Sequence, residues 1–468
     1  MTDLTRLSAT ELIAGYRDRS VSPVEATRAA LAAIEAADDD VNAFVLVDAD
    51  AALAAAKQSE ARWHAGCTRG PGDGVPTSIK DIFYTRGWPT LRGTNLIEEN
   101  QDWTEDAPAV ARLRETGAVL LGKTSTPEFA WKGVTDSLRH GATGNPWNPA
   151  MTSGGSSGGS ATAVGLGMGA WSVGTDGGGS VRIPAAFTGT VAIKPTYGLV
   201  PMWPASPFGT LAHAGPMTRT VTDAALMLGI LAGFDPRDWS ALPTPATSFL
   251  TGLDDGVRGL RIAFSPTLGY VRNDPQVEAA VRSAAAVLAD AGAVVEETDP
   301  GFSDPLDAFH VLWFAGAAKV VEAYGPDALQ RVDPGLRRGI ERAGAISAGD
   351  YLDATAVRMD LGVRMGRFHQ TYDLLLTPTL PVTAFPKGMD APKGWHCEDW
   401  TSWTPYTYPF NMTQQPAASV PCGFTSDGLP VGLQIVGPRH ADALVLRAAR
   451  AYELATGWSS AIPPLTRP

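Results

Sequence analysis

Two turns rich in glycine and serine are the part of this sequence best suited to chemistry. One covers residues 152–160 and reads TSGGSSGGS; the other covers residues 174–182 and reads GTDGGGSVR. Glycines at this density let the main chain turn sharply and bring its N–H groups close to a ligand. Serines in such turns act as flexible filler, bind an anion or serve as a nucleophile. Residues 161–170 between the turns are apolar and predict a buried helix, which argues against a flexible linker.

A lysine ends a short β-prone segment upstream of these turns. Residues 77–79 favour a strand that delivers Lys80 and then Asp81. Taken alone, this pair is typical of an ordinary surface ion pair. Neighbouring side chains of a strand face opposite sides, so Asp81 is expected to point away from Lys80.

Residues 117–124 match the phosphate-binding pattern G-x-x-x-x-G-K-T. The four variable residues are Ala-Val-Leu-Leu, which predict a buried strand where a phosphate loop needs exposed backbone N–H groups. Pro127 also follows too soon for a helix that opens at Lys123. We therefore expect a strand here and no nucleotide site.

Helical and strand patterns alternate along the chain. Serine capping boxes predict helices over 8–18 and 23–37, and alanine-rich residues 48–64 predict a third. Residues 259–264 and 293–296 read as strands on either side of a helix, which implies parallel pairing. The pattern predicts one α/β domain over residues 1–468. Its expected parts are N-terminal helices (1–70), a core with both turns (71–235), a mostly helical excursion (236–371) and a return to the sheet (372–468).

Composition excludes several classes of function. The 468 residues carry a net charge of −12 and show no basic cluster, which argues against a nucleic-acid partner. The three cysteines, Cys67, Cys397 and Cys422, form no disulfide framework, so we expect a cytoplasmic protein. No zinc-ligand motif, signal peptide or membrane-spanning run is present, and we expect no metal, no cofactor and no membrane partner.

Several motifs, in this order, resemble the amidase signature family, and in particular its stand-alone bacterial-type amidases. The motifs are Ser78-Ile-Lys80-Asp81 and residues 145–149 (NPWNP), 154–160 (GGSSGGS), 174–184 (GTDGGGSVRIP), 194–198 (KPTYG), 215–219 (GPMTR) and 428–432 (GLPVG). The resemblance implies a mixed, twisted β-sheet covered on both faces by helices. It also implies a metal-free hydrolase of amide C–N bonds that acts on a small molecule as a monomer or homodimer.

The resemblance assigns a catalytic triad. It implies that Ser180 is the nucleophile and that Lys80 is the base. Ser156, which follows a cis peptide bond, is implied to pass protons between Ser180 and Lys80. A lysine serves as a base only when neutral, so burial must lower its pKa. The N–H groups of Gly177, Gly178, Gly179 and Ser180 are expected to form the oxyanion hole. Asp176, Arg182 and Ser157 are expected to support the loop, although the family commonly has Thr or Ile at the position of Gly177.

A group of aromatic residues indicates where the substrate-binding cleft is expected. Residues 388–409 are irregular, and an aromatic cluster here and just beyond is predicted to line an apolar cleft: Trp395, Trp400, Trp403, Tyr406, Tyr408 and Phe410. By motif order, Ala130 falls at a substrate-contacting position, next to Trp131. Ala130, Trp131, Trp403 and Tyr406 are therefore the candidate substrate contacts. The expected substrates are apolar or aromatic amides such as aryl acylamides, together with carbamates (urethanes) or esters.

Two alternatives remain open at this point. Residues 154–158 also fit G-x-S-x-G, the nucleophile elbow of α/β-hydrolases, with His213, His310, His369, His396 or His440 as a partner. The family also includes the glutaminase subunit of a tRNA-dependent amidotransferase. Thr404 stands where that subunit has the acid that holds the glutamine amine, although Arg338 matches its arginine.

Overall fold

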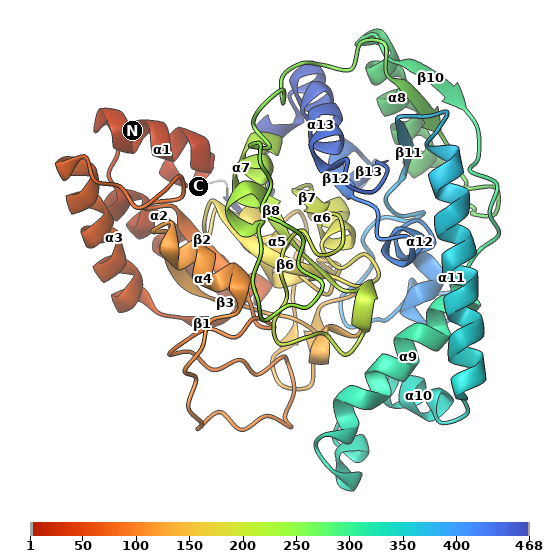
Figure 1. Cartoon of the computed structure of the whole chain (residues 1–468). Helices are drawn as coiled ribbons and strands as arrows, with labels where there is room; N and C mark the ends of the chain where they lie inside the picture. Colours follow the sequence, from red (N-terminus) through yellow and green to blue (C-terminus); the bar gives the residue numbers. More distant parts are fainter. Residues whose placement is uncertain (1–2, 467–468) are drawn as a thin grey trace.

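An eleven-stranded mixed sheet forms the centre of the protein, seen here in a computed structural model that describes residues 3–466 (Figure 1). The strand order is β1-β3-β2-β6-β8-β7-β12-β13-β11-β9-β10. The strands of this sheet are β1 (Phe44–Val47), β2 (Pro76–Lys80), β3 (Val119–Thr124), β6 (Trp171–Asp176), β7 (Val191–Lys194), β8 (His213–Thr218), β9 (Arg261–Phe264), β10 (Val294–Glu297), β11 (Leu374–Pro378), β12 (Ala417–Phe424) and β13 (Pro430–Val436). A separate two-stranded ribbon pairs β4 (Asp136–Ser137) with β5 (Gly141–Ala142).

Helices cover both faces of the sheet, as predicted. They are α1 (Ala9–Asp18), α2 (Pro23–Val41), α3 (Ala49–Ala65), α4 (Pro108–Glu115), α5 (Gly158–Gly165), α6 (Arg182–Thr188), α7 (Val221–Leu231), α8 (Pro275–Asp290), α9 (Leu306–Glu322), α10 (Pro334–Ala343), α11 (Ala348–Phe368), α12 (Tyr408–Met412) and α13 (Asp442–Thr456). Figure 1 shows α1–α3 at one end of the molecule and α9–α11 at the other.

The alternation of side chains along the strands divides the core into two layers. Leu374 and Leu376 of β11 belong to the layer that packs against α7, α8 and α13, whereas Leu375 belongs to the layer under α6 and α9. This period of two is what a strand buried on both faces requires. Because both faces of such a strand are buried, the side chains on both faces are apolar, and the strand reads as a nearly continuous apolar run.

Most predicted elements are confirmed. Ser8 and Ser22 form the capping boxes of α1 and α2, and β9 and β10 pair in parallel. The G-x-x-x-x-G-K-T segment is the buried strand β3, where Lys123 Nζ lies 3.2 Å from Asp81 Oδ1. The predicted helix over 161–170 is too long, because α5 ends at Gly165 and the chain turns through Gly167 (φ +74°) and Gly169 (φ +126°).

Candidate active site

The two glycine–serine turns meet at one edge of the sheet. Strands β2 and β6 are parallel neighbours, so their carboxyl ends place Lys80 and Asp176 at the same edge. The turn before α5 carries Ser156, and the turn between β6 and α6 carries Ser180. The Ser157 N–H donates to the Ser180 carbonyl oxygen at 3.1 Å, which ties the turns together. The carboxyl edge of parallel strands is where α/β sheets bind ligands.

Lys80 is buried beneath the turns and contacts Ser156. Its Nζ atom lies 2.6 Å from Ser156 Oγ and 2.8 Å from Thr175 Oγ1, and the residue has no exposed surface. Burial lowers the pKa of Lys80 well below its usual value, against the opposing effect of the Asp176 carboxylate. A neutral amine in this place can accept a proton from the Ser156 hydroxyl.

The position of Ser156 depends on the glycine before it. The Gly155–Ser156 peptide bond is cis. A Cβ atom on Gly155 would lie 2.4 Å from the Val134 carbonyl carbon, so a side chain there would displace the turn. On the C-terminal side of Ser156, the Oγ atom of Ser157 donates to the Thr175 carbonyl oxygen at 3.2 Å, which ties the turn to β6.

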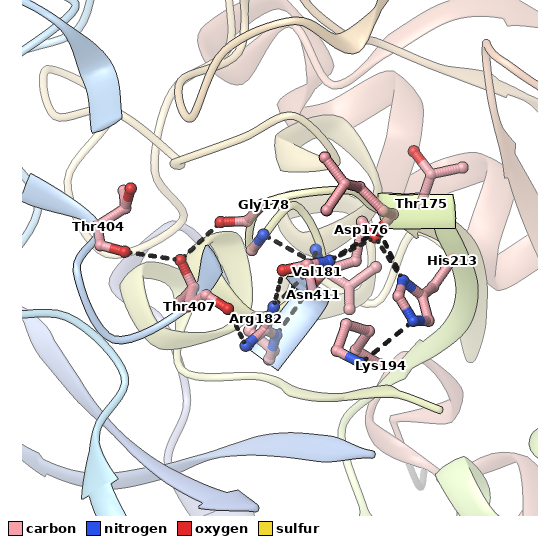
Figure 2. A network of polar contacts seen from close by, with 12 residues as sticks. Thr175, Asp176, Gly178, Val181, Arg182, Lys194, His213, Thr404, Thr407 and Asn411 are labelled. Atoms are coloured by element: carbon pink, nitrogen blue, oxygen red, sulfur yellow. Dashed lines mark hydrogen bonds and ion pairs between the residues drawn. The ribbon is translucent and has the colours of Figure 1, made fainter. Parts of the chain in front are cut away.

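Asp176 and Arg182 hold the second turn from beneath (Figure 2). The Asp176 carboxylate accepts from Arg182 at 2.9 and 3.0 Å and from the N–H groups of Gly179 (2.8 Å) and Val181 (3.3 Å). Burial alone would raise the pKa of Asp176, but the Arg182 guanidinium keeps it below its usual value. The turn is therefore built around a buried, ionised carboxylate.

The C-terminal part of the chain completes this network. Arg182 donates to the Thr407 carbonyl oxygen (3.0 Å), to Gln434 Oε1 (2.7 Å) and to Asn411 Oδ1 (2.7 Å). Thr407 Oγ1 donates to the Gly178 carbonyl oxygen at 2.6 Å. Thr407 lies within the irregular stretch 388–409, whose aromatic residues were predicted to line a cleft, and Asn411 lies just beyond it; the supporting role of these two residues was not predicted.

One expected oxyanion-hole donor is used elsewhere. The Gly179 N–H points at Asp176 Oδ1, so it does not face a substrate, and the prediction for Gly179 is wrong. Within residues 3–466, the N–H groups of Gly177, Gly178 and Ser180 have no hydrogen-bond acceptor in the protein. Of these three residues, Gly177 and Ser180 also line the pocket next to Ser156.

The pocket above Ser156 and Ser180 has mostly apolar walls. Its lining residues are Ile82, Phe83, Arg92, Phe129, Ala130, Ser156, Thr175, Gly177, Ser180, Met202, Trp203, Pro204, Ala205, Ser206, Pro207, Phe208, Ala212, Trp313 and Val320. The expected contact Ala130 is among them. No histidine lines the pocket as the described residues define it, which leaves the nucleophile-elbow alternative without its base.

The aromatic cluster after residue 394 does not form the walls of this pocket, contrary to the prediction. Trp403 is fully buried against Phe187, with ring centroids 5.8 Å apart. Tyr406 is also buried, and its Oη atom lies 2.6 Å from the Pro266 carbonyl oxygen. These side chains fill the core behind the turn instead.

Trp131 is not a pocket wall either. Its carbonyl oxygen accepts a hydrogen bond from Trp313 Nε1 at 3.0 Å, and its ring packs against Gly335. The aromatic walls come from residues 83–208 and from α9, which periodicity could not assign to a pocket.

A second buried lysine lies behind the site. Lys194 Nζ lies 3.4 Å from His213 Nε2 (Figure 2). Lys194 Nζ also contacts the Gln415 carbonyl oxygen, and His213 Nδ1 lies 2.8 Å from the Leu211 carbonyl oxygen. Burial lowers the pKa of both Lys194 and His213 well below the usual values. Neither side chain lines the pocket, and His213 Nδ1 also lies 3.2 Å from the Asp176 carbonyl oxygen, so this pair packs behind the Asp176 turn.

Comparison with known proteins agrees with this site. The family model named Amidase matches residues 25–446. An acylamidase from Rhodococcus erythropolis is 38% identical over 464 residues, covering 98% of this chain and 97% of the relative. The A subunit of the glutamyl-tRNA(Gln) amidotransferase from Chloroflexus aurantiacus is 36% identical, covering 99% of this chain and all (100%) of the relative.

Solved structures give the same result. A bacterial aryl acylamidase of the amidase signature enzymes superposes with a TM-score of 0.91 at 31% identity, covering 97% of each chain. A 6-aminohexanoate cyclic dimer hydrolase superposes with a TM-score of 0.89 at 29% identity, covering 100% of each chain. The chain therefore belongs to the amidase signature family, and it is a hydrolase that acts on amide C–N bonds.

None of the helices between residues 3 and 466 is both long and apolar enough to cross a lipid bilayer.

Proposed function

We propose that the chain is a stand-alone amidase that hydrolyses apolar or aromatic amides through Lys80, Ser156 and Ser180. One observation carries this proposal. A fully buried lysine lies 2.6 Å from Ser156 Oγ, and Ser156 and Ser180 line the same pocket.

The proposed reaction begins with attack by Ser180 Oγ on the substrate carbonyl carbon. Ser156 takes the proton of Ser180 and passes its own proton to the neutral Lys80 amine. The oxygen of the tetrahedral intermediate becomes negative and accepts from the free N–H groups of Gly177, Gly178 or Ser180. When the C–N bond breaks, the proton returns through Ser156 to the leaving amine. Water then hydrolyses the acyl-enzyme by the same proton path.

The pocket walls support an apolar substrate. The aromatic residues of the described lining are Phe83, Phe129, Trp203, Phe208 and Trp313. Pockets of this composition obtain most of their affinity from removing apolar ligand surface from water. The acylamidase relative and the aryl acylamidase structure are consistent with anilides as substrates. Aryl carbamates and esters pass through the same tetrahedral chemistry and are included in the proposal.

A glutaminase role within an amidotransferase is the second candidate, because a protein of that kind is also among the relatives. Three features favour the stand-alone enzyme. The lining of the pocket, all of it within the described residues, contains no carboxylate to bind the amine of glutamine. Thr404 is buried and its carbonyl oxygen accepts from Thr407 Oγ1 at 3.0 Å, so Thr404 supports the turn. Arg338 lies exposed on α10 and outside the pocket.

A substrate panel tests the proposal. Purified protein is assayed with p-nitroacetanilide, a p-nitrophenyl ester, an aryl carbamate and glutamine. We expect turnover of the anilide and of at least one aryl ester or carbamate, without any partner protein. Hydrolysis of glutamine alone would overturn the proposal in favour of the amidotransferase role.

A further inference from the structure

One charged side chain stands out among the otherwise uncharged pocket walls. Of the described residues that line the pocket, Arg92 alone carries a charge. The proposed acyl transfer does not use it, because the proton path involves Ser156 and Lys80. The Arg92 side chain is half-buried, and a guanidinium partly withdrawn from water is stabilised by an anionic partner.

The protein itself supplies no anion to Arg92. Within residues 3–466, its guanidinium makes no ion pair and no hydrogen bond, and its Nε atom is buried without an acceptor. The guanidinium lies over the ring of Tyr84, with the ring centroid 5.3 Å from the Arg92 Cζ atom. Arg182, by contrast, has its donors paired within the network beneath Ser180.

The backbone holds Arg92 firmly at this wall. Its N–H donates to Asp81 Oδ2 at 2.9 Å, and its carbonyl oxygen accepts from the Phe129 N–H at 2.8 Å. Asp81 follows Lys80 directly, so the same end of β2 positions both the base and this arginine. Arg92 also adopts a left-handed backbone conformation (φ +54°), which is unfavourable for a residue with a side chain. Strained residues held by rigid surroundings concentrate at functional sites.

We propose that Arg92 binds a carboxylate of the substrate, so that the preferred substrates are amides with an apolar body and an anionic group. This inference rests on the proposed function, since it names the substrate class of the same pocket. The planar guanidinium matches a carboxylate with two parallel hydrogen bonds, and the adjacent Tyr84 ring limits its motion. The carboxylate belongs either to the acyl part or to the amine part of the amide.

Two matched pairs of anilides separate these sources. The first pair is 4-acetamidobenzoate and 4-methylacetanilide, in which the amine part carries either a carboxylate or a methyl group. The second pair is succinanilate and 4-methylpentananilide, in which the acyl part ends in either a carboxylate or two methyl groups. Product anilines are measured, and each pair gives a ratio of kcat/KM for the carboxylate over its uncharged partner.

We expect Arg92→Met to lower this ratio in one of the pairs by about 10- to 100-fold, the range for lost hydrogen bonds to a charged group. Arg92→Lys should recover part of the ratio, because it keeps the charge but not the fork of donors. The affected pair identifies the part of the substrate that carries the carboxylate. Unchanged ratios in both pairs with Arg92→Met would overturn the inference.

Arg237 offers a matched control. It lies over the ring of the pocket residue Trp203, with its Cζ atom 5.0 Å from the centroid, but it is paired with Asp235 at 2.9 Å and does not line the pocket. Arg237→Met should leave both ratios unchanged. An equal loss in the two variants would point to a general effect of net charge and contradict a role specific to Arg92.

A binding measurement keeps the inference separate from the proposed chemistry. Calorimetry with Ser180→Ala compares the affinities of 4-acetamidobenzoate and succinanilate with those of their uncharged partners. We expect tighter binding of one carboxylate, lost in Ser180→Ala/Arg92→Met, whether or not any anilide is hydrolysed. Equal binding of carboxylate and uncharged partners would overturn the inference, and thermal melting of each variant verifies that it is folded.

Discussion

The ring of Trp313 occupies the space that a side chain on Gly177 would need. A Cβ atom built on Gly177 lies 2.8 Å from Trp313 Cζ3, closer than real Cβ contacts allow. Gly177 departs from the Thr or Ile common in the family, and α9 places a tryptophan in the freed volume. Phe208 stacks on this ring with centroids 3.9 Å apart. The glycine and the tryptophan therefore act as one unit of the pocket wall.

We predict that Gly177→Thr alone is harmful and that a smaller residue at position 313 relieves it. Overpacking against Trp313 should lower the free energy of unfolding by about 1–3 kcal/mol and reduce kcat/KM. Adding Trp313→Leu should recover part of the lost stability and part of the lost kcat/KM. A double-mutant cycle on melting and kcat/KM measures the coupling, and strictly additive effects would contradict the shared space.

Removal of Ser180 should abolish both turnover and covalent labelling. Ser180→Ala should lower kcat by at least about 10³-fold, because the attacking oxygen is lost. A fluorophosphonate probe should label the wild type but not this variant. Ser283→Ala, an exposed position on α8, is the control and should keep full labelling. Labelling that persists in Ser180→Ala would place the nucleophile elsewhere.

The buried lysine predicts how stability depends on pH. Burial lowers the pKa of Lys80 in the folded protein, whereas the unfolded chain keeps a value near 10.5. Between these two values the unfolded state binds one more proton, so the contribution of Lys80 to stability rises with pH by about 1.4 kcal/mol per unit. Lys80→Met should therefore be more stable than the wild type near pH 7, and this difference should shrink toward pH 10. A constant difference across that range would mean that Lys80 is charged when folded.

The same titration should govern activity. Only neutral Lys80 accepts a proton, so kcat/KM should fall as the pH drops through the pKa of the folded protein and stay high above it. Lys80→Arg keeps a charge that no accessible pH removes and should be inactive throughout. Initial rates from pH 5 to 10 with one anilide test this expectation, and measurable turnover by Lys80→Arg would argue against a base at this position.

The Asp176–Arg182 pair should be far more important to stability than a surface pair. Arg182→Met leaves the Asp176 carboxylate buried without its cation and should cost about 3–5 kcal/mol. Arg282 on α8 is the matched control, because it bridges Glu278 (2.9 Å) and Glu297 (2.7 Å) with 44% of its side chain exposed. Arg282→Met should cost less than about 1 kcal/mol by denaturant titration. Similar losses for both variants would contradict the role of burial.

Local signals explain which elements could be predicted from sequence. Capping serines indicated α1 and α2, and the helical pattern between two strands indicated α8, because those signals are local in the sequence. Strand β8 (His213–Thr218) was missed, since Gly215 and Pro216 lower its strand propensity and only its pairing with β6 and β7 makes it a strand. Strand β1 was missed because it has only four residues between two helices.

In the candidate site, too, the residues marked by local motifs were predicted and those placed by tertiary packing were not. The motifs led to Lys80, Ser156 and Ser180 because the family resemblance attaches roles to them. The pocket walls were assigned to residues around Trp403 and Tyr406, since a crowd of aromatics near irregular backbone is typical of a cleft. The chain instead uses those rings as core behind the turn, and Trp313 and Arg92 reach the pocket from segments without such a signal. Which apolar side chains face a cavity depends on tertiary packing, which periodicity does not encode.

The reach of Arg182 across the chain has a consequence for biosynthesis. Its partners Thr407, Asn411 and Gln434 are translated more than 200 residues after it. A growing polypeptide on the ribosome thus carries both serines and the lysine long before the turn that presents Ser180 has its support. The turn can therefore gain its full support only after β13 has been synthesised, and a chain that stops before β13 carries Lys80, Ser156 and Ser180 without that support.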